Sequence, residues 1–253
     1  RVLFRSIRPH NEKRFSVSWS PPVPRMREYV MALRAIWRSW EIGEKLRFEG
    51  EHYTFTLMTP NFVPPSTGQV PVPITMAAVG EHSLRLSGEV CDGVRLHPFC
   101  TRAYLEDIVM ARINEGLDKT CRTRGSFEVT GGGFIATGET EEEVNKVAEW
   151  VRHRIAFYGS TPSYWPVFDH HGCGDLGRKL NRMTKAGKWD EIANEIPDDV
   201  LHLFAVIAPY GQLENAIIKR FGGVVDAIYA STSQDIRPQI PSDVLQDIAR
   251  IPT

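Results

Sequence analysis

The residues with the clearest chemical potential lie between Pro71 and Phe99. Ile74 to Val79 is an almost unbroken apolar run, which is typical of a strand buried on both faces, as in a parallel sheet. Gly80 ends this run, and the next three residues, 81–83, begin a helix. A helix that starts directly after a strand presents backbone N–H groups that can bind an anion. The sequence therefore predicts a phosphate site on the turn at Gly80.

A histidine stands at the end of the next predicted strand. Asp92-Gly93 forms a turn into the apolar segment Val94–His97, which places His97 at the carboxyl end of that strand. In an α/β barrel this end is where ligands bind. A lone histidine on an apolar strand is usually a core residue, so two interpretations of His97 stay open: contact with substrate or cofactor, or simple packing. Arg95, on the same side of the strand, is expected to pair with a carboxylate.

The two turns around this helix resemble those of the luciferase-like monooxygenase superfamily. Its members carry an Ala-Ala-x-Gly turn, a short helix and an Ala-Gly-x-x-Ala-Asp-Gly turn. The corresponding residues here are Ala77-Ala78-Val79-Gly80 and Ser87-Gly88-Glu89-Val90-Cys91-Asp92-Gly93. Similar residues in the same order occur at 10–15, 25–37 and 48–53. The resemblance extends over approximately residues 5–230.

This resemblance implies a TIM (β/α)8 barrel and an oxidoreductase of the monooxygenase class. Such an enzyme uses a reduced flavin (FMN) or a deazaflavin coenzyme of the F420 type, bound at the C-terminal mouth of the barrel, to oxidise or reduce a small organic substrate. Deazaflavin is the favoured cofactor, because it is common among similar members. The family uses the Gly80 turn for the cofactor phosphate, so the predicted cofactor-binding residues are Ala77, Ala78, Val79, Gly80, Glu81, His82, Ser83 and His97.

The strands predict only part of a barrel. A complete barrel needs about 250 residues or more, yet this chain of 253 residues contains about five of the eight strands, at Val2–Phe4, Ile74–Val79, Val94–His97, Glu128–Ala136 and Val225–Ala230. We therefore expect an N-terminal truncation of the order of 100 residues against the family pattern. The acid and base groups of the family, a histidine and a glutamate, would precede Arg1. Catalytic residues within this chain are thus unknown, with His97 as a candidate, and the fragment by itself could lack activity.

One feature departs from the family. Members carry a Gly-x-Gly turn shortly before the segment that matches residues 10–15, whereas residues 2–7 contain no glycine. Either this stretch is divergent or that part of the pocket is altered.

Four helices are predicted by apolar residues at three- and four-residue steps, at Pro24–Trp40, Thr101–Cys121, Thr140–Tyr158 and Gln212–Phe221. Phe48–Tyr53 predicts a small hairpin. Residues 159–199 break the alternating pattern with prolines, glycines and aromatic residues. Because the family carries an insertion there, we interpret 159–199 as a cap or lid within a single domain, 1–253, and expect Tyr164 and Trp165 to pack inside it.

Composition favours small-molecule chemistry. With 30 basic and 31 acidic residues the net charge is −1, which gives no bias toward nucleic acid or an anionic membrane. No apolar run reaches the roughly 18 residues of a membrane span. The four cysteines lack C-x-x-C spacing, and His170-His171 lacks the spacing of a ligand set, so no metal site is predicted. A reducing cytoplasm is the expected compartment, and a homodimer is consistent with the family.

Two alternatives stay open, because a strand followed by glycine and a helix occurs in most α/β proteins. The chain could be a cofactor-free barrel remnant that acts as a binding module. It could also belong to a non-redox barrel enzyme that binds a phosphorylated ligand at the same turn.

Overall fold

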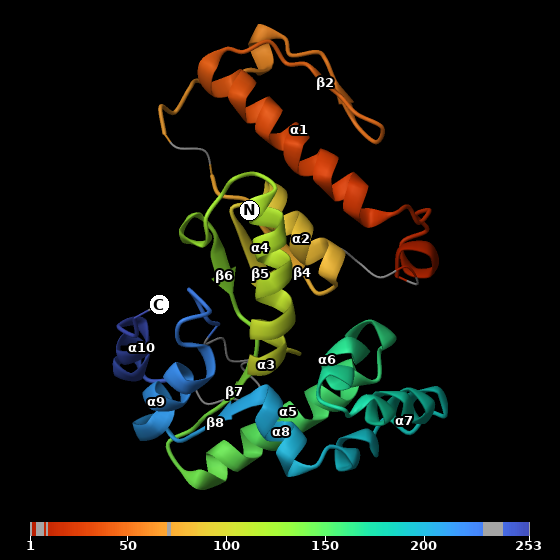
Figure 1. The fold of residues 1–253 in the computed structure, drawn as a ribbon, viewed down its shortest axis with the longest axis vertical. Coiled ribbons are helices and arrows are strands. Elements are labelled where there is room, and N and C mark those ends of the chain that lie inside the picture. Colours follow the sequence, from red (N-terminus) through yellow and green to blue (C-terminus); the bar gives the residue numbers. More distant parts are fainter. Residues whose placement is uncertain (1, 4–7, 9, 70–71, 230–239, 253) are drawn as a thin grey trace. The chain divides into compact units, whose positions relative to one another are not determined.

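The computed structural model describes residues 2–3, 8, 10–69, 72–229 and 240–252 (Figure 1). The chain forms two compact units. The first comprises residues 1–94 and 112–127, and the second comprises residues 95–111 and 128–253. The predicted single domain, 1–253, is not tested by this division and stays a prediction.

The first unit contains the predicted strand, turn and helix. β1 (Val2–Leu3) pairs in parallel with β4 (Thr75–Ala78), and β4 lies between β1 and β5 (Gly93–Leu96) in the sheet. α2 (Glu81–Val90) connects β4 to β5. The alternation predicted for residues 74–97 is therefore confirmed. The predicted first strand also exists at Val2–Leu3, whereas the glycine-free stretch that departs from the family falls largely on residues 4–7, outside the described residues.

The longest helix of this unit is α1 (Pro22–Ile42), which ends at Gly43 in the left-handed conformation, with φ of 69°. Its Arg34 binds Asp92 at 2.9 Å, and the Asp92 carboxylate also accepts the N–H of Ile74 at 2.7 Å. The aspartate of the second family turn therefore joins α1 to the start of β4. The predicted hairpin is present as β2 (Phe48–Glu49) and β3 (Thr54–Phe55), and η1 (His10–Arg14) and η2 (Pro60–Phe62) complete the segment.

α2 packs closely against α4 (Ala111–Asp118), which is followed by η4 (Arg124–Ser126) (Figure 1). A Cβ atom on Gly88 would lie 2.3 Å from the carbonyl oxygen of Ile113. A Cβ atom on Gly116 would lie 2.1 Å from the carbonyl oxygen of Arg85. Glycine is required at both positions because the two helix backbones touch there. The glycine of the second family turn thus serves helix packing.

The second unit corrects one predicted element. The strand predicted over Glu128–Ala136 is interrupted: β6 (Glu128–Thr130) follows β5 in the first sheet, whereas β7 (Phe134–Ala136) pairs in parallel with β8 (Ala205–Ile207). Gly131 and Gly132 between them adopt φ values of 89° and 106°, which interrupt the regular extended backbone. β8 was not predicted, because it is only three residues long and its pairing with β7 is a long-range interaction. The final predicted strand, Val225–Ala230, is reduced to one parallel bridge between Thr130 and Ala227 in the described residues.

Threonines stand at the starts of two helices of this unit, at the first residues of the ranges predicted from the sequence. Thr101 accepts the N–H of Tyr104 at 3.1 Å, and Thr140 accepts the N–H of Glu143 at 3.2 Å. Thr101 caps α3 (Arg102–Tyr104), which continues as η3 (Leu105–Met110), and Thr140 caps α5 (Glu141–Gly159). Two further helices, α9 (Tyr210–Phe221) and α10 (Ser242–Ala249), lie near the C-terminus. Within the described residues, no helix has both the length and the apolar character that crossing a membrane requires.

Residues 159–199 are largely helical and pack on α5. They form η5 (Pro162–Tyr164), α6 (Trp165–His170), α7 (Gly174–Lys185) and η6 (Ile192–Glu195), and α8 (Asp198–Phe204) follows. The ring of Tyr164 lies 5.4 Å from that of Phe99, and the Trp165 indole N–H donates to the Gly159 carbonyl at 3.1 Å. Trp165 therefore packs inside the segment, as expected, whereas the rings that Tyr164 contacts, those of His97, Phe99 and Tyr158, lie outside it. Its role as a cap stays a prediction.

Candidate functional site

The turn after β4 presents free backbone donors. Gly80 is the N-cap residue of α2, with φ of −80° and ψ of 150°, and no side chain caps the helix there. The N–H groups of Ser83 and Leu84 bond to the Gly80 carbonyl at 2.9 and 3.0 Å. Those of Gly80, Glu81 and His82 have no partner among the described residues. The amino end of α2 therefore keeps three donors available to an anion.

This turn is also sterically open. Gly80 is exposed, and a Cβ atom placed on it would meet no other atom within 4 Å. Glu81 and His82 are exposed as well, Ala77, Val79 and Ser83 are half-buried, and Ala78 is only 4% exposed. The seven predicted residues from Ala77 to Ser83 are thus contiguous in the fold. Their role in cofactor binding stays a prediction.

The charged side chains around the turn form ion pairs, so their charges cancel. Arg112 binds Glu81 at 2.6 Å and also binds Glu115, which accepts a further hydrogen bond from Arg85 at 2.7 Å. The hydrogen bond to Glu81, and then that to Glu115, raises the pKa of Arg112. Two guanidinium groups and two carboxylates sum to zero charge. An anion at this turn would therefore be held mainly by backbone N–H groups and the helix dipole.

A groove of about 310 Å³ lies beside α2. Of the predicted site residues, His82 lines it, together with residues 21–24 at the start of α1. Its buried carboxylate, Glu89, is bound by Arg27 and, at 2.7 Å, by Lys119. The charged groups of this groove are therefore already paired.

His97 follows β5 and lies in an aromatic cluster of the second unit. Its ring centroid is 4.4 Å from that of Tyr158 and 4.8 Å from that of Tyr164. Its Nδ1 accepts the N–H of Phe99 at 3.0 Å. Burial lowers the pKa of His97 to about 4, and burial raises the pKa of Tyr164 to about 12. At neutral pH His97 is therefore uncharged, with its proton on Nε2, and can donate there but cannot act as a cation.

The other residues that the sequence singled out have structural partners. The Arg95 guanidinium lies 3.8 Å from the ring centroid of Tyr229, so its contact in the described chain is an aromatic face, and the expected carboxylate partner is not seen there. His170 binds Asp107 at 3.0 Å, and His171 binds the Thr101 hydroxyl at 2.7 Å.

In the described part of the chain, three potential metal ligands come together at Glu28, Glu51 and His52. The Glu28 carboxylate accepts the backbone N–H groups of Glu51, His52 and Tyr53 at 3.0, 2.7 and 3.1 Å. Its oxygens therefore stabilise the hairpin.

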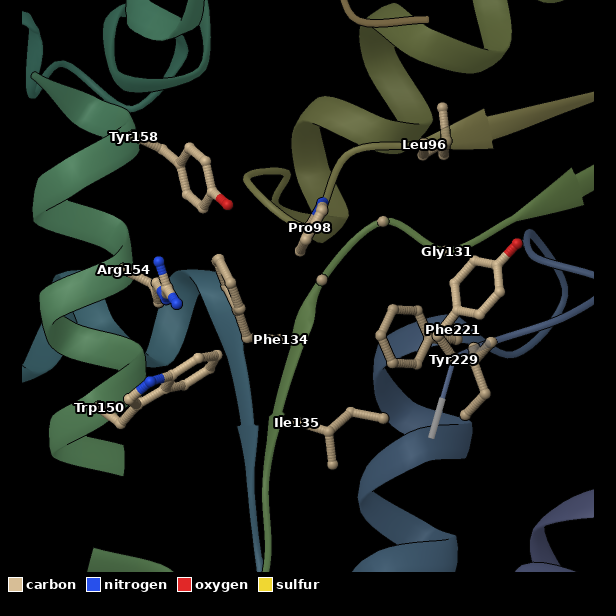
Figure 2. A pocket seen from close by; sticks show the side chains of 13 residues that line it. Leu96, Pro98, Gly131, Phe134, Ile135, Trp150, Arg154, Tyr158, Phe221 and Tyr229 are labelled. Atoms are coloured by element: carbon tan, nitrogen blue, oxygen red, sulfur yellow. The ribbon is translucent and has the colours of Figure 1, made fainter. Parts of the chain in front are cut away.

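Sequence reasoning missed a pocket of about 310 Å³ in the second unit (Figure 2). It lies where three chain segments leave their strands: Leu96 at the end of β5 and Pro98 after it, Gly131–Gly133 after β6, and Ile228–Tyr229 after the bridge at Ala227. The carboxyl ends of strands are the usual ligand-binding positions of α/β barrels. The glycine triplet was the available signal, since three adjacent glycines are unusual inside a strand.

The glycines allow these segments to approach closely. A Cβ atom on Gly131 would lie 3.0 Å from the Leu96 carbonyl oxygen, and one on Gly133 would lie 3.0 Å from the Phe221 ring and 3.2 Å from the Arg220 guanidinium. On the opposite side, α5 contributes Trp150, Arg154 and Tyr158 to the lining (Figure 2). Among the described residues, the pocket is therefore bounded by aromatic rings, one guanidinium group and the backbone of the glycine segment.

Comparison with known proteins decides the family. A sequence model described as luciferase-like monooxygenase matches residues 2–227. The chain belongs to the luciferase-like monooxygenase family. Uncharacterized protein Rv1360 of Mycobacterium tuberculosis is 44% identical over 233 residues, which cover 90% of this chain and 68% of that protein. The 5,10-methylenetetrahydromethanopterin reductase of Archaeoglobus fulgidus is 24% identical over 201 residues, 77% of this chain and 55% of the reductase.

Solved structures agree on the luciferase-like fold. The coenzyme F420-dependent tetrahydromethanopterin reductase of Methanopyrus kandleri matches with a TM-score of 0.68 and 16% identity over 93% of this chain. The EDTA monooxygenase of Chelativorans matches with a TM-score of 0.59 and 15% identity over 95% of this chain and 61% of the enzyme. The chain spans 64% of the reductase structure. These matches confirm the predicted fold class, part of a luciferase-like α/β barrel, and the family supports an oxidoreductase role.

Proposed function

We propose that this luciferase-like chain belongs to a flavin- or deazaflavin-dependent oxidoreductase, and that the amino end of α2 holds the phosphate of the cofactor. The observation that carries the proposal is the uncapped turn at Gly80, where three consecutive N–H groups have no partner among the described residues. A helix of ten residues follows these donors, so its dipole favours negative charge at the same point.

The residues of the turn fit a phosphate group. Gly80 leaves space on the backbone, and the small Ala77 and Ala78 precede it at the end of β4. The Glu81 carboxylate, which would repel an anion, is bound by Arg112. When bound, the cofactor would supply hydride transfer if it is a deazaflavin, or also oxygen activation if it is a flavin.

The chain's own contribution would be binding and orientation. The N–H groups of Gly80, Glu81 and His82 would fix the phosphate. His97 would present an uncharged ring, with a proton on Nε2, to a substrate or cofactor that lies beside it. Because its pKa is about 4, His97 is better suited to donating a hydrogen bond than to accepting a proton at neutral pH.

Deazaflavin is the cofactor that we favour. The Methanopyrus structure is that of a coenzyme F420-dependent reductase, and the Archaeoglobus relative is a methylenetetrahydromethanopterin reductase. The EDTA monooxygenase is the counterexample, a structural match named as a monooxygenase. The identity of the cofactor would then decide between hydride transfer and oxygenation.

The test is a titration of the purified protein with FMN and, separately, with the deazaflavin coenzyme, followed by quenching of cofactor fluorescence. We expect saturable binding of one of them, and loss of that binding in Gly80→Asp. The backbone angles of Gly80 suit an aspartate N-cap, so this variant should fold normally while its carboxylate occupies the anion position. Gly80→Ala is the matched control, because its methyl group meets no neighbour in the described structure.

Two outcomes would overturn the proposal. Binding of neither cofactor would favour the binding-module or phosphorylated-ligand alternatives, and competition with inorganic phosphate or a sugar phosphate would separate those two. Cofactor binding that is equally tight in wild type and Gly80→Asp would remove the turn from the site.

A further inference from the structure

One face of α5 carries three side chains into the pocket of the second unit. Trp150, Arg154 and Tyr158 are spaced four residues apart, so they lie above one another on the same side of the helix. Figure 2 shows them as a column that faces Phe134, the first residue of β7. A cation is thus placed between two aromatic rings inside a concave site.

Arg154 has no carboxylate partner among the described residues. Its guanidinium carbon lies 4.8 Å from the Trp150 ring centroid, which is a cation–π contact and leaves the hydrogen-bond donors of the guanidinium group unused. By contrast, its neighbour on the helix, Arg152, binds both Glu149 at 3.0 Å and Asp198 at 2.6 Å.

The surroundings of the pocket are positive. No aspartate or glutamate is among the described residues that line it. Arg95 lies against the Tyr229 ring, and Arg220 lies behind Gly133, where its guanidinium donates to the carbonyls of Cys100 and Leu203 at 2.6 Å each. Arg220 is held by these carbonyl groups, whereas Arg95 and Arg154 each contact an aromatic ring, and of the three arginines only Arg154 is among the described residues that line the pocket. A ligand of opposite charge would complete the site.

The remaining lining suits an apolar body. Phe134, Trp150, Tyr158 and Phe221 supply aromatic surface, and the N–H groups of Gly132 and Gly133 have no partner among the described residues. A volume of about 310 Å³ is at the lower end of small-molecule sites. With a single guanidinium in the lining, the geometry matches a carboxylate, which one arginine can bind through two parallel hydrogen bonds.

We propose that this pocket binds a small organic monocarboxylate with an aromatic or otherwise flat apolar body, and that Arg154 pairs with its carboxylate. If the proposed function holds, this ligand is the substrate or a close analogue of it, and only that step rests on the proposed function. The binding itself requires no cofactor.

The experiment measures binding by isothermal titration calorimetry on the purified protein without cofactor. The probes are benzoate and phenylacetate, their neutral amides, and acetate as a carboxylate without a ring. We expect the two aromatic acids to bind at least about tenfold more tightly than their amides or acetate, which corresponds to about 1.4 kcal/mol. Arg154→Met should lose this preference, and Arg154→Lys should recover part of it.

Arg182→Met is the matched control, because Arg182 is an exposed arginine on α7 of the same unit and does not line the pocket. It should bind the acids as wild type does. Circular dichroism checks that each variant is folded. Absence of binding by either acid, equal binding of acids and amides, or unchanged binding in folded Arg154→Met would each overturn the proposal.

Failure of this proposal is distinguishable from failure of the proposed function. Gly80→Asp should bind benzoate normally while losing the cofactor. Arg154→Met should lose the preference for benzoate while binding the cofactor normally. A protein that binds the acids but neither cofactor would support the pocket and contradict the proposed function.

Discussion

The guanidinium Nε of Arg112 lies 2.6 Å from a carboxylate oxygen of Glu81, the first residue of α2. Glu81 adjoins the N–H groups that we propose as the phosphate site, and its free carboxylate would repel an anion there. Arg112, on α4, compensates this charge and is itself fixed by Glu115. The pair therefore links the packing of α4 on α2 to the electrostatics of the turn.

Arg112→Met should weaken cofactor binding by roughly tenfold, or about 1.4 kcal/mol, because it leaves the Glu81 charge uncompensated beside the phosphate. The check is the fluorescence titration described above, performed at low ionic strength, where such charge effects are least screened. Adding Glu81→Gln to this variant should restore most of the affinity. A double variant that binds as weakly as Arg112→Met would show that Arg112 does not act through Glu81.

His97 should make the stability of the protein depend on pH. Its pKa is lowered from 6.5 to about 4 in the folded state by burial, so the unfolded chain binds the proton first as the pH falls. The free energy of unfolding should therefore decrease between about pH 6.5 and pH 4, by an amount of the order of 3 kcal/mol.

Urea unfolding at pH 7.5, 6 and 5 tests this expectation. His97→Asn, whose side-chain oxygen can still accept the N–H of Phe99, should lose this part of the pH dependence. His153→Asn, an exposed substitution on α5, should retain it. Identical pH slopes in wild type and His97→Asn would contradict the assignment.

Gly88→Ala should destabilise the first unit by about 1–3 kcal/mol or more, because its methyl group would lie 2.3 Å from the Ile113 carbonyl oxygen and would push the backbones of α2 and α4 apart. The midpoint of urea denaturation measures the effect. Gly125→Ala is the control, since Gly125 is exposed and a Cβ there meets nothing within 4 Å. It should change stability by less than about 0.5 kcal/mol. If Gly88→Ala and Gly125→Ala had the same midpoint of urea denaturation, the close approach of α2 and α4 at Gly88 would not contribute to stability.

Local signals in the sequence were sufficient for the elements around the turn. The apolar run before Gly80 and the Asp92-Gly93 turn correctly predicted β4, α2 and β5, because each signal acts over a few residues. Thr101 and Thr140 marked helix starts for the same reason, since an N-cap hydrogen bond spans only three residues. The motif resemblance supplied the family, which the comparisons confirm.

The segment around Gly131 shows where local reasoning failed. Its apolar residues on both sides predicted one strand, but glycines at positive φ divide it into β6 and β7, which join different sheets. β8 is only three residues long and becomes a strand because it pairs with β7. Strand pairing is a long-range interaction, so a short segment by itself does not encode it.

The sequence by itself determined the family and the strand, turn and helix around Gly80, since these depend on residues that are neighbours in the chain. Only the tertiary structure decided that Arg154 lacks a carboxylate partner in the described chain, that burial keeps His97 uncharged, and that segments near residues 97, 132, 154 and 228 enclose a pocket. Charge compensation, desolvation and enclosure depend on which distant residues come together. Folding alone establishes those contacts.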